Sequence, residues 1–226
     1  MERRRYLQSI AATGIVATAG CLDAVPGLGS RTILGEPEVD LSASTHPSHG
    51  DDMPEVSLPD PISGETVSTA DLEGERAQLM TFFYTNCPDG MCPALILRLR
   101  RAQAVAAENG IGDRAAFLAA TFDPERDTAE ALETYAGEQG VDLDAGNWHF
   151  LRPETYETGQ ELYEEEFGLV IQKTDAEGYE NLEYAFPHYN LILLANADGV
   201  VERAYPNAVG VDVERIVDDF VTVVNG

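Results

Sequence analysis

The feature that most constrains the fold is an apolar strand that runs through a short loop into a helix. Residues 78–84, Gln-Leu-Met-Thr-Phe-Phe-Tyr, are typical of a buried strand. From Ala94 the chain is rich in strong helix formers, and Pro93 suits the first turn of a helix. We therefore expect Cys87 just past a strand, and Cys92 just before or within the first turn of a helix.

The rest of the chain alternates between strand and helix patterns. We predict strands at 115–121, 148–151, 189–195 and 200–205, helices at 129–136, 155–166 and 211–224, and a strand or hairpin within 168–184. Asn196-Ala-Asp-Gly199 predicts a hairpin turn between the last two strands. This order predicts an α/β fold of the thioredoxin-like type, with a central mixed sheet flanked by helices.

The N-terminus has the order of an export and lipidation signal. Residues 2–8, Glu-Arg-Arg-Arg-Tyr-Leu-Gln, match the twin-arginine pattern. The apolar stretch that follows spans about ten residues, whereas a membrane-spanning helix needs roughly 20. Small residues then precede Cys21 and resemble a lipobox. We predict a signal peptide at 1–20, twin-arginine export, and a lipid anchor at Cys21 on the outer face of the cytoplasmic membrane. The alternatives are an ordinary signal peptide, or an uncleaved anchor with an incidental Cys21.

Two segments follow the signal peptide. Residues 21–54 are rich in Ser, Pro, Gly and Asp and lack apolar periodicity, so we predict a flexible tether that buries too little surface to offset the entropy of ordering. Residues 55–226 are long enough for one domain with a substantial core.

The chain is strongly acidic. It contains 40 acidic and 14 basic residues, for a net charge of −26, and Lys173 is its only lysine. A nucleic-acid-binding protein needs a basic surface, so the charge excludes that class, as it excludes electrostatic binding to anionic lipid. The acidic residues are spread along the chain, which suits a halophile because high salt screens their repulsion.

Cys87 and Cys92 are the remaining pair if Cys21 carries lipid, and we interpret them as one redox or metal site. The N-terminus of a helix carries partial positive charge, which favours the thiolate form of a nearby cysteine. A thiolate attacks disulfides and binds soft cations such as Cu(I) or Zn(II). From the spacing alone, a structural disulfide that closes a small loop is an equal alternative.

Four segments together resemble the SCO/SenC family of copper-delivery proteins. They are Tyr84-Thr-Asn-Cys-Pro-Asp-Gly-Met-Cys-Pro93, Phe122-Asp-Pro-Glu-Arg-Asp-Thr128, Trp148-His-Phe-Leu151, and His188-Tyr-Asn-Leu-Ile-Leu-Leu194 with Asp198-Gly199. Their order and spacing match the family over roughly residues 55–226. One departure is that four residues separate the cysteines, where the family usually has three. We expect Gly90 to absorb the insertion by adopting a positive φ.

The resemblance implies a copper site, for Cu(I) or Cu(II), with Cys87, Cys92 and His188 as ligands. It implies that Asp123 lies near the cysteine loop in a supporting role. It also implies delivery of copper to the dinuclear copper site of cytochrome c oxidase, whose subunit carrying that site would be the partner. A membrane tether on the same side raises the effective concentration of the two proteins.

Three other functions stay open. A thiol–disulfide oxidoreductase would use Cys87 as the attacking thiolate and Cys92 as the resolving one, would not need His188, and is the alternative in which the chain is an enzyme. A peroxiredoxin-like peroxidase lacks support, since we find no T-x-x-C environment with a matching arginine. A structural disulfide would predict no metal affinity and no sensitivity to His188.

Overall fold

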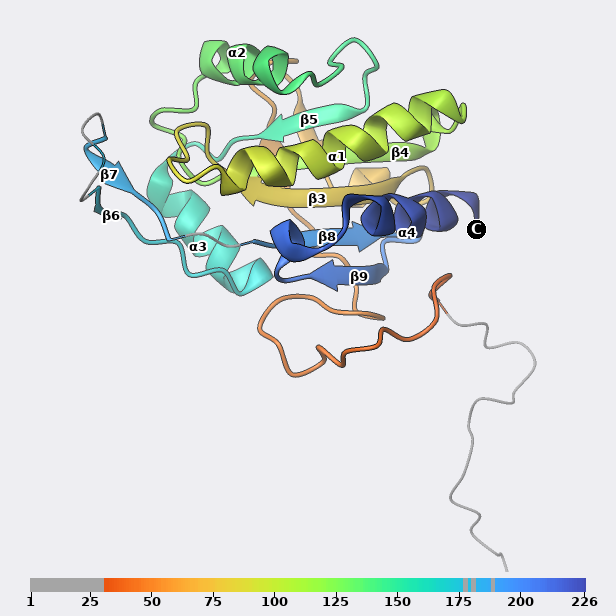
Figure 1. The fold of residues 1–226 in the computed structure, drawn as a ribbon. Coiled ribbons are helices and arrows are strands. Elements are labelled where there is room, and N and C mark those ends of the chain that lie inside the picture. The colour runs from red at the N-terminus through yellow and green to blue at the C-terminus, as the bar shows by residue number, and fades with distance from the viewer. Residues whose placement is uncertain (1–30, 177–178, 180–181, 188–189) are drawn as a thin grey trace, which may run out of the picture. The chain divides into compact units, whose positions relative to one another are not determined.

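A five-stranded mixed sheet lies at the centre of the computed structural model, which describes residues 31–176, 179, 182–187 and 190–226 (Figure 1). Its strands, in spatial order, are β5 (Trp148–Leu151), β4 (Ala115–Thr121), β3 (Ala77–Phe83), β8 (Ile192–Ala195) and β9 (Val201–Tyr205). The β3–β4 and β4–β5 pairs are parallel, whereas the β3–β8 and β8–β9 pairs are antiparallel. The predicted central mixed sheet is therefore confirmed.

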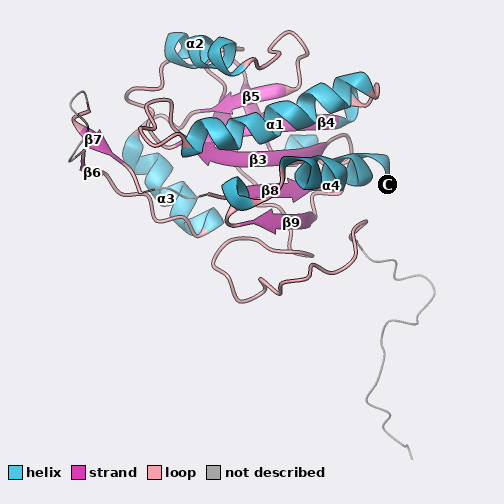
Figure 2. Cartoon of the chain, viewed as in Figure 1, coloured by secondary structure: helices cyan, strands magenta, loops and turns pink. Residues whose placement is uncertain are grey.

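Helices cover both faces of this sheet (Figure 2). They are α1 (Met91–Glu108), α2 (Ala129–Gln139), α3 (Tyr156–Phe167) and α4 (Val213–Asn225). The Phe82 ring contacts Tyr163 and Phe167 of α3. The next residue, Phe83, stacks on Tyr135 of α2. Because successive side chains of a strand point to opposite faces, α2 and α3 lie on opposite faces of the sheet.

Helices α1 and α4 pack against each other, and α4 lies on the same face as α2 (Figure 1). Phe220 of α4 contacts Phe117, with ring centroids 5.4 Å apart. Phe117 is in register with Leu79 and therefore shares a face with Phe83. Every residue of β3 and β4 is buried, as expected of apolar strands covered on both sides.

The smaller elements lie in the connections. They are β1 (Ser57–Pro59), β2 (Thr66–Ser68), β6 (Thr174–Asp175), β7 (Tyr184–Ala185), and the 3-10 helices η1 (Ala70–Leu72), η2 (Gly112–Arg114) and η3 (Ala208–Gly210). The β6–β7 pair forms the hairpin predicted within 168–184. The β1–β2 pair was not predicted, because three-residue strands give little periodicity.

The described part of the predicted tether, residues 31–54, is hydrogen-bonded to the folded domain. The Gly50 N–H donates to the Val201 carbonyl, and the Val201 N–H donates to the Asp51 carbonyl, each at 2.9 Å. This segment therefore covers the outer edge of β9, whose backbone groups would otherwise lack partners. Residues 31–226 form one compact unit, so position 55 is not a boundary between tether and domain in the structure.

Glu202 anchors the start of this segment. Its carboxylate is fully buried and accepts hydrogen bonds from the Ile33 N–H at 2.7 Å, the Leu34 N–H at 2.8 Å and Asn196 Nδ2 at 2.6 Å. The composition of residues 21–54 could not predict this contact, because the acceptor Glu202 lies almost 170 residues away in the chain.

The predicted signal peptide at 1–20 and the predicted lipidation site at Cys21 lie outside the described residues. Among the residues that the structure describes, no helix has the length and apolar character that crossing a membrane requires.

Candidate metal centre

Cys87 and Cys92 lie where the sequence placed them, after β3 and at the start of α1. The helix begins at Met91, so Cys92 is in its first turn. The Cys92 N–H donates a hydrogen bond to Cys87 Sγ at 3.2 Å, and both side chains are thiols. Gly90 caps the helix with φ of 80°, which confirms the expected positive φ. The longer loop thus still turns the Cys87 sulfur toward the helix N-terminus.

The two sulfurs have different environments. Cys87 is partly exposed, whereas the Cys92 side chain is 1% exposed. Burial raises the pKa of the Cys92 thiol, and the neighbouring Cys87 sulfur raises it further. For Cys92, burial therefore acts against the thiolate form that the helix N-terminus is expected to favour. It is Cys87 that accepts the N–H from the first turn.

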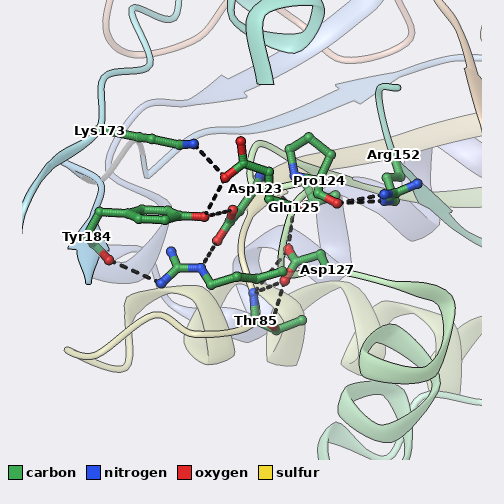
Figure 3. A network of polar contacts seen from close by, with 10 residues as sticks. Thr85, Asp123, Pro124, Glu125, Asp127, Arg152, Lys173 and Tyr184 are labelled. Atoms are coloured by element: carbon green, nitrogen blue, oxygen red, sulfur yellow. Dashed lines mark hydrogen bonds and ion pairs between the residues drawn. The ribbon is translucent and has the colours of Figure 1, made fainter. Parts of the chain in front are cut away.

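Asp127 fixes the backbone immediately before the cysteine loop (Figure 3). Its carboxylate accepts hydrogen bonds from the Thr85 N–H at 3.2 Å and the Thr85 hydroxyl at 2.5 Å, and from the Thr121 hydroxyl. Asp127 is fully buried, and burial raises its pKa to about 6, against the effect of both hydroxyls. The sequence gives no local signal for this role of Asp127, since Thr85 lies 42 residues away in the chain. The residue that caps α2 is Thr128.

Asp123 is also buried, but it faces the β6–β7 hairpin. Its carboxylate accepts a hydrogen bond from the Tyr184 hydroxyl at 2.8 Å and forms an ion pair with Arg126. Among the described residues it makes no hydrogen bond with either cysteine. Within the Asp-Pro-Glu-Arg-Asp segment, the second aspartate thus contacts Thr85 at the start of the cysteine loop, and the first contacts the hairpin. A supporting role for Asp123 at the cysteine loop stays a prediction.

The chain before position 188 packs beside the chain before Cys87. Phe186 is buried, and its ring centroid lies 5.1 Å from that of Tyr84 and 5.0 Å from that of Phe122. On the other side of position 188, the Leu191 carbonyl accepts a hydrogen bond from Thr81 of β3 at 2.8 Å. His188 itself lies outside the described residues. The two flanks of position 188 thus contact Tyr84 and Thr81, in the segment that leads to the cysteines.

An open cleft of about 430 Å³ gives access to the cysteine loop from the side of α2. Its lining is polar and acidic, formed by Thr85, Asn86, Thr128, Glu130, Ala131, Thr134, Tyr135 and Glu138. Within the described ranges, no three His, Cys, Asp or Glu side chains are grouped so as to hold a metal ion. The donors that the described site does offer are two thiols, which favour soft cations.

Comparisons with known proteins point to one family. The SCO1/SenC family model matches residues 61–225. No curated protein matches the chain at a significant level.

Solved structures agree with the family match. A SCO1/SenC family lipoprotein from Bacillus anthracis has a TM-score of 0.61 at 22% identity, and the match covers 76% of this chain and 94% of that one. Arabidopsis thaliana ScoI with copper bound has a TM-score of 0.59 at 21% identity, covering 79% and 99%. BsSco, a member of the Sco family of cytochrome c oxidase assembly proteins, has a TM-score of 0.60 at 20% identity, covering 80% and 97%.

At these identities the structural matches establish the fold, which confirms the predicted thioredoxin-like arrangement. The family model spans most of the chain and includes both cysteines, the Asp-Pro-Glu-Arg-Asp segment and the β6–β7 hairpin. The chain therefore belongs to the SCO1/SenC family.

Proposed function

We propose that the chain is a copper metallochaperone, which binds copper through Cys87, Cys92 and His188 and delivers it to the dinuclear copper centre of cytochrome c oxidase. The observation that carries the proposal is the hydrogen bond of 3.2 Å from the Cys92 N–H to Cys87 Sγ, which brings two soft donors together at a helix N-terminus. Support comes from the family, in which ScoI of Arabidopsis thaliana is solved with copper bound.

The donor set suits copper as a transferable cargo. Two thiolates and one imidazole favour Cu(I), and thiolates pass a soft ion by ligand exchange without releasing it to water. Because burial raises the pKa of the Cys92 thiol, copper must displace its proton when it binds. Proton return at Cys92 would in turn assist the release of copper to the recipient.

Export and anchoring would place the chain beside its recipient. The twin-arginine segment and Cys21 would hold it on the outer face of the cytoplasmic membrane. The dinuclear copper centre belongs to a domain on that same side, so a shared membrane raises the effective concentration of the two proteins.

A Cu(I) titration of the reduced full chain in high salt, against a competing chelator, tests the proposal. All variants carry Cys21→Ser, which removes the third thiol and the lipidation site. We expect one tight equivalent in this background, weaker binding in His188→Ala, and loss of tight binding in Cys87→Ala/Cys92→Ala. Binding that is absent, or indifferent to His188, would contradict copper delivery.

The exposure of the two sulfurs favours a second candidate, a thiol–disulfide oxidoreductase. The more exposed Cys87 would attack a substrate disulfide and release one substrate thiol. The buried Cys92 would then attack the mixed disulfide, release the second thiol and leave a Cys87–Cys92 disulfide, which an external dithiol would reduce again. Turnover of a disulfide peptide that is abolished in Cys87→Ser and retained in His188→Ala would support this function.

A further inference from the structure

Five side chains join the β6–β7 hairpin to the segment 123–127 in a network of polar contacts (Figure 3). They are Asp123, Glu125, Arg126, Lys173 and Tyr184, and we call them the hairpin clamp. Sequence reasoning assigned a role to only the first of them. Three of the five come from the segment between β4 and α2, and the other two come from the hairpin and the residue before it.

Lys173, the only lysine of the chain, is the cation at one end of the hairpin clamp. Its Nζ lies 2.8 Å from Glu125 Oε2 and 4.5 Å from the ring centroids of both Tyr156 and Tyr184. An ammonium between two aromatic rings gains cation–π attraction in addition to its ion pair. In a high-salt medium the ion pair is screened, whereas the ring contacts persist, so the arrangement suits an acidic, salt-adapted surface.

Tyr184 is the centre of the hairpin clamp. Its hydroxyl donates to Asp123 Oδ1 at 2.8 Å and to Glu125 Oε2 at 3.1 Å. The Arg126 guanidinium lies 3.8 Å from the ring centroid and donates to the Tyr184 carbonyl at 3.2 Å. Ring, hydroxyl and backbone of this one residue are therefore all held by the segment 123–127.

The hairpin needs this support. β6 and β7 contain two residues each, and a hairpin of that size is marginal in water without further contacts. The same segment 123–127 also holds the cysteine loop, because Asp127 accepts two hydrogen bonds from Thr85. The hairpin clamp and Asp127 thus connect the chain before Cys87 to Tyr184, which lies four positions before His188.

We propose that the hairpin clamp positions the third copper ligand, with Lys173 and Tyr184 as positioning residues that act through His188. This inference rests on the proposed copper site. A loop that must be ordered when the metal binds loses conformational entropy, and a loop already fixed loses less. Breaking the hairpin clamp should therefore weaken the contribution of His188 and leave the thiolate contribution intact.

A double-mutant cycle on the full chain with Cys21→Ser tests this role. Cu(I) affinity is measured for Lys173→Met and Tyr184→Phe, each with His188 present and each combined with His188→Ala. Tyr184→Phe keeps the ring contacts and removes only the hydroxyl. We expect each change to weaken binding about tenfold with His188 present, in the range found for groups that orient metal ligands, and to have no effect with His188→Ala.

Two control variants separate positioning from general loss of structure. Lys173→Arg keeps the cation and should retain the affinity. Arg101→Gln breaks an ion pair of 3.0 Å with Glu214 on the surface and makes the same change in net charge, and it should leave copper affinity unchanged. Electron paramagnetic resonance of the Cu(II) complex gives an independent readout, because nitrogen coupling from the imidazole should be reduced both in His188→Ala and in Lys173→Met.

The outcomes distinguish this inference from the function on which it rests. If His188→Ala weakens binding but Lys173→Met and Tyr184→Phe have no effect, or the same effect in both backgrounds, the hairpin clamp has no positioning role and copper delivery still stands. If His188→Ala by itself has no effect, both proposals are overturned.

Discussion

Replacing Asp127 with asparagine should remove a pH dependence of stability that the buried carboxylate imposes on the fold. Burial raises the pKa of Asp127 from its ordinary value of 3.8 to about 6. The folded protein then holds this proton more tightly than the unfolded chain, so the free energy of unfolding decreases as pH rises through this window. One pKa unit corresponds to about 1.4 kcal/mol, so ionisation of Asp127 removes about 3 kcal/mol of stability between about pH 4 and pH 6.

Asparagine keeps the shape of the side chain but cannot ionise. Near pH 4 we expect Asp127→Asn to be about 1 kcal/mol less stable than wild type, the usual effect of one weakened hydrogen bond. Above about pH 6, ionisation of Asp127 has lowered the free energy of unfolding of the wild type by about 3 kcal/mol, whereas the variant has no ionisable group at this position. Since the variant starts about 1 kcal/mol lower, it should then be about 2 kcal/mol more stable than wild type. The order of the two stabilities therefore reverses with pH.

Urea unfolding of both proteins at fixed high salt, between about pH 4 and pH 7, measures this reversal. The other carboxylates impose a pH dependence that both proteins share, so the difference between the two curves isolates Asp127. The matched control is Asp113→Asn, at an exposed acidic residue, whose curve should run parallel to that of wild type. A difference between wild type and Asp127→Asn that stays constant with pH would refute the reasoning, because the threonine hydroxyls would then fully offset burial.

Three further predictions test other parts of the molecule. Cu(I) affinity should rise about tenfold per pH unit for each proton that copper displaces, because burial raises the pKa of the Cys92 thiol and favours its protonated form. Competition with a chelator at several pH values measures this dependence, and an affinity that does not change with pH would contradict the prediction. Gly90→Ala should cost about 1–2 kcal/mol because φ is 80° there. Gly137→Ala, within α2, should instead raise the free energy of unfolding by up to about 1 kcal/mol. Thermal unfolding compares the two variants, and an equal change in stability in both would contradict the argument. Glu202→Ala should cost about 2–3 kcal/mol, because the partly buried N–H groups of Ile33 and Leu34 and the buried Asn196 amide lose this acceptor. Hydrogen exchange should then accelerate at residues 33 and 34, and unchanged protection there would exclude the anchoring role.

Local patterns predicted the elements that carry the cysteines. The run at 78–84 became β3, and the strands predicted at 115–121 and 148–151 coincide with β4 and β5. These strand predictions are confirmed because a strand that is buried on both faces needs a nearly continuous run of apolar residues. Such a run can be recognised in the sequence. The helix after the cysteines starts at Met91 rather than Ala94, because Gly90 in the left-handed region sets its first turn.

Long-range packing decided which carboxylate contacts which part of the site. Asp123 and Asp127 lie four residues apart, and the local sequence does not distinguish their roles. Only the parallel pairing of β3 with β4 brings Thr85 to Asp127, 42 residues away, and only the hairpin brings Tyr184 to Asp123, 61 residues away. The same holds for Lys173, whose role depends on Glu125 and two aromatic rings from other segments.

The fold class, the place of Cys87 and Cys92 between a strand and a helix, and the family could all be predicted from the amino-acid sequence, because each of these depends on spacing along the chain. Contacts between distant segments place residues 50–52 along the edge of β9, bury the Cys92 thiol and so raise its pKa, and let the Asp-Pro-Glu-Arg-Asp segment hold both the cysteine loop and the hairpin. Burial and hydrogen bonding depend on neighbours in space, and sheet register sets those neighbours across distances that no local pattern records.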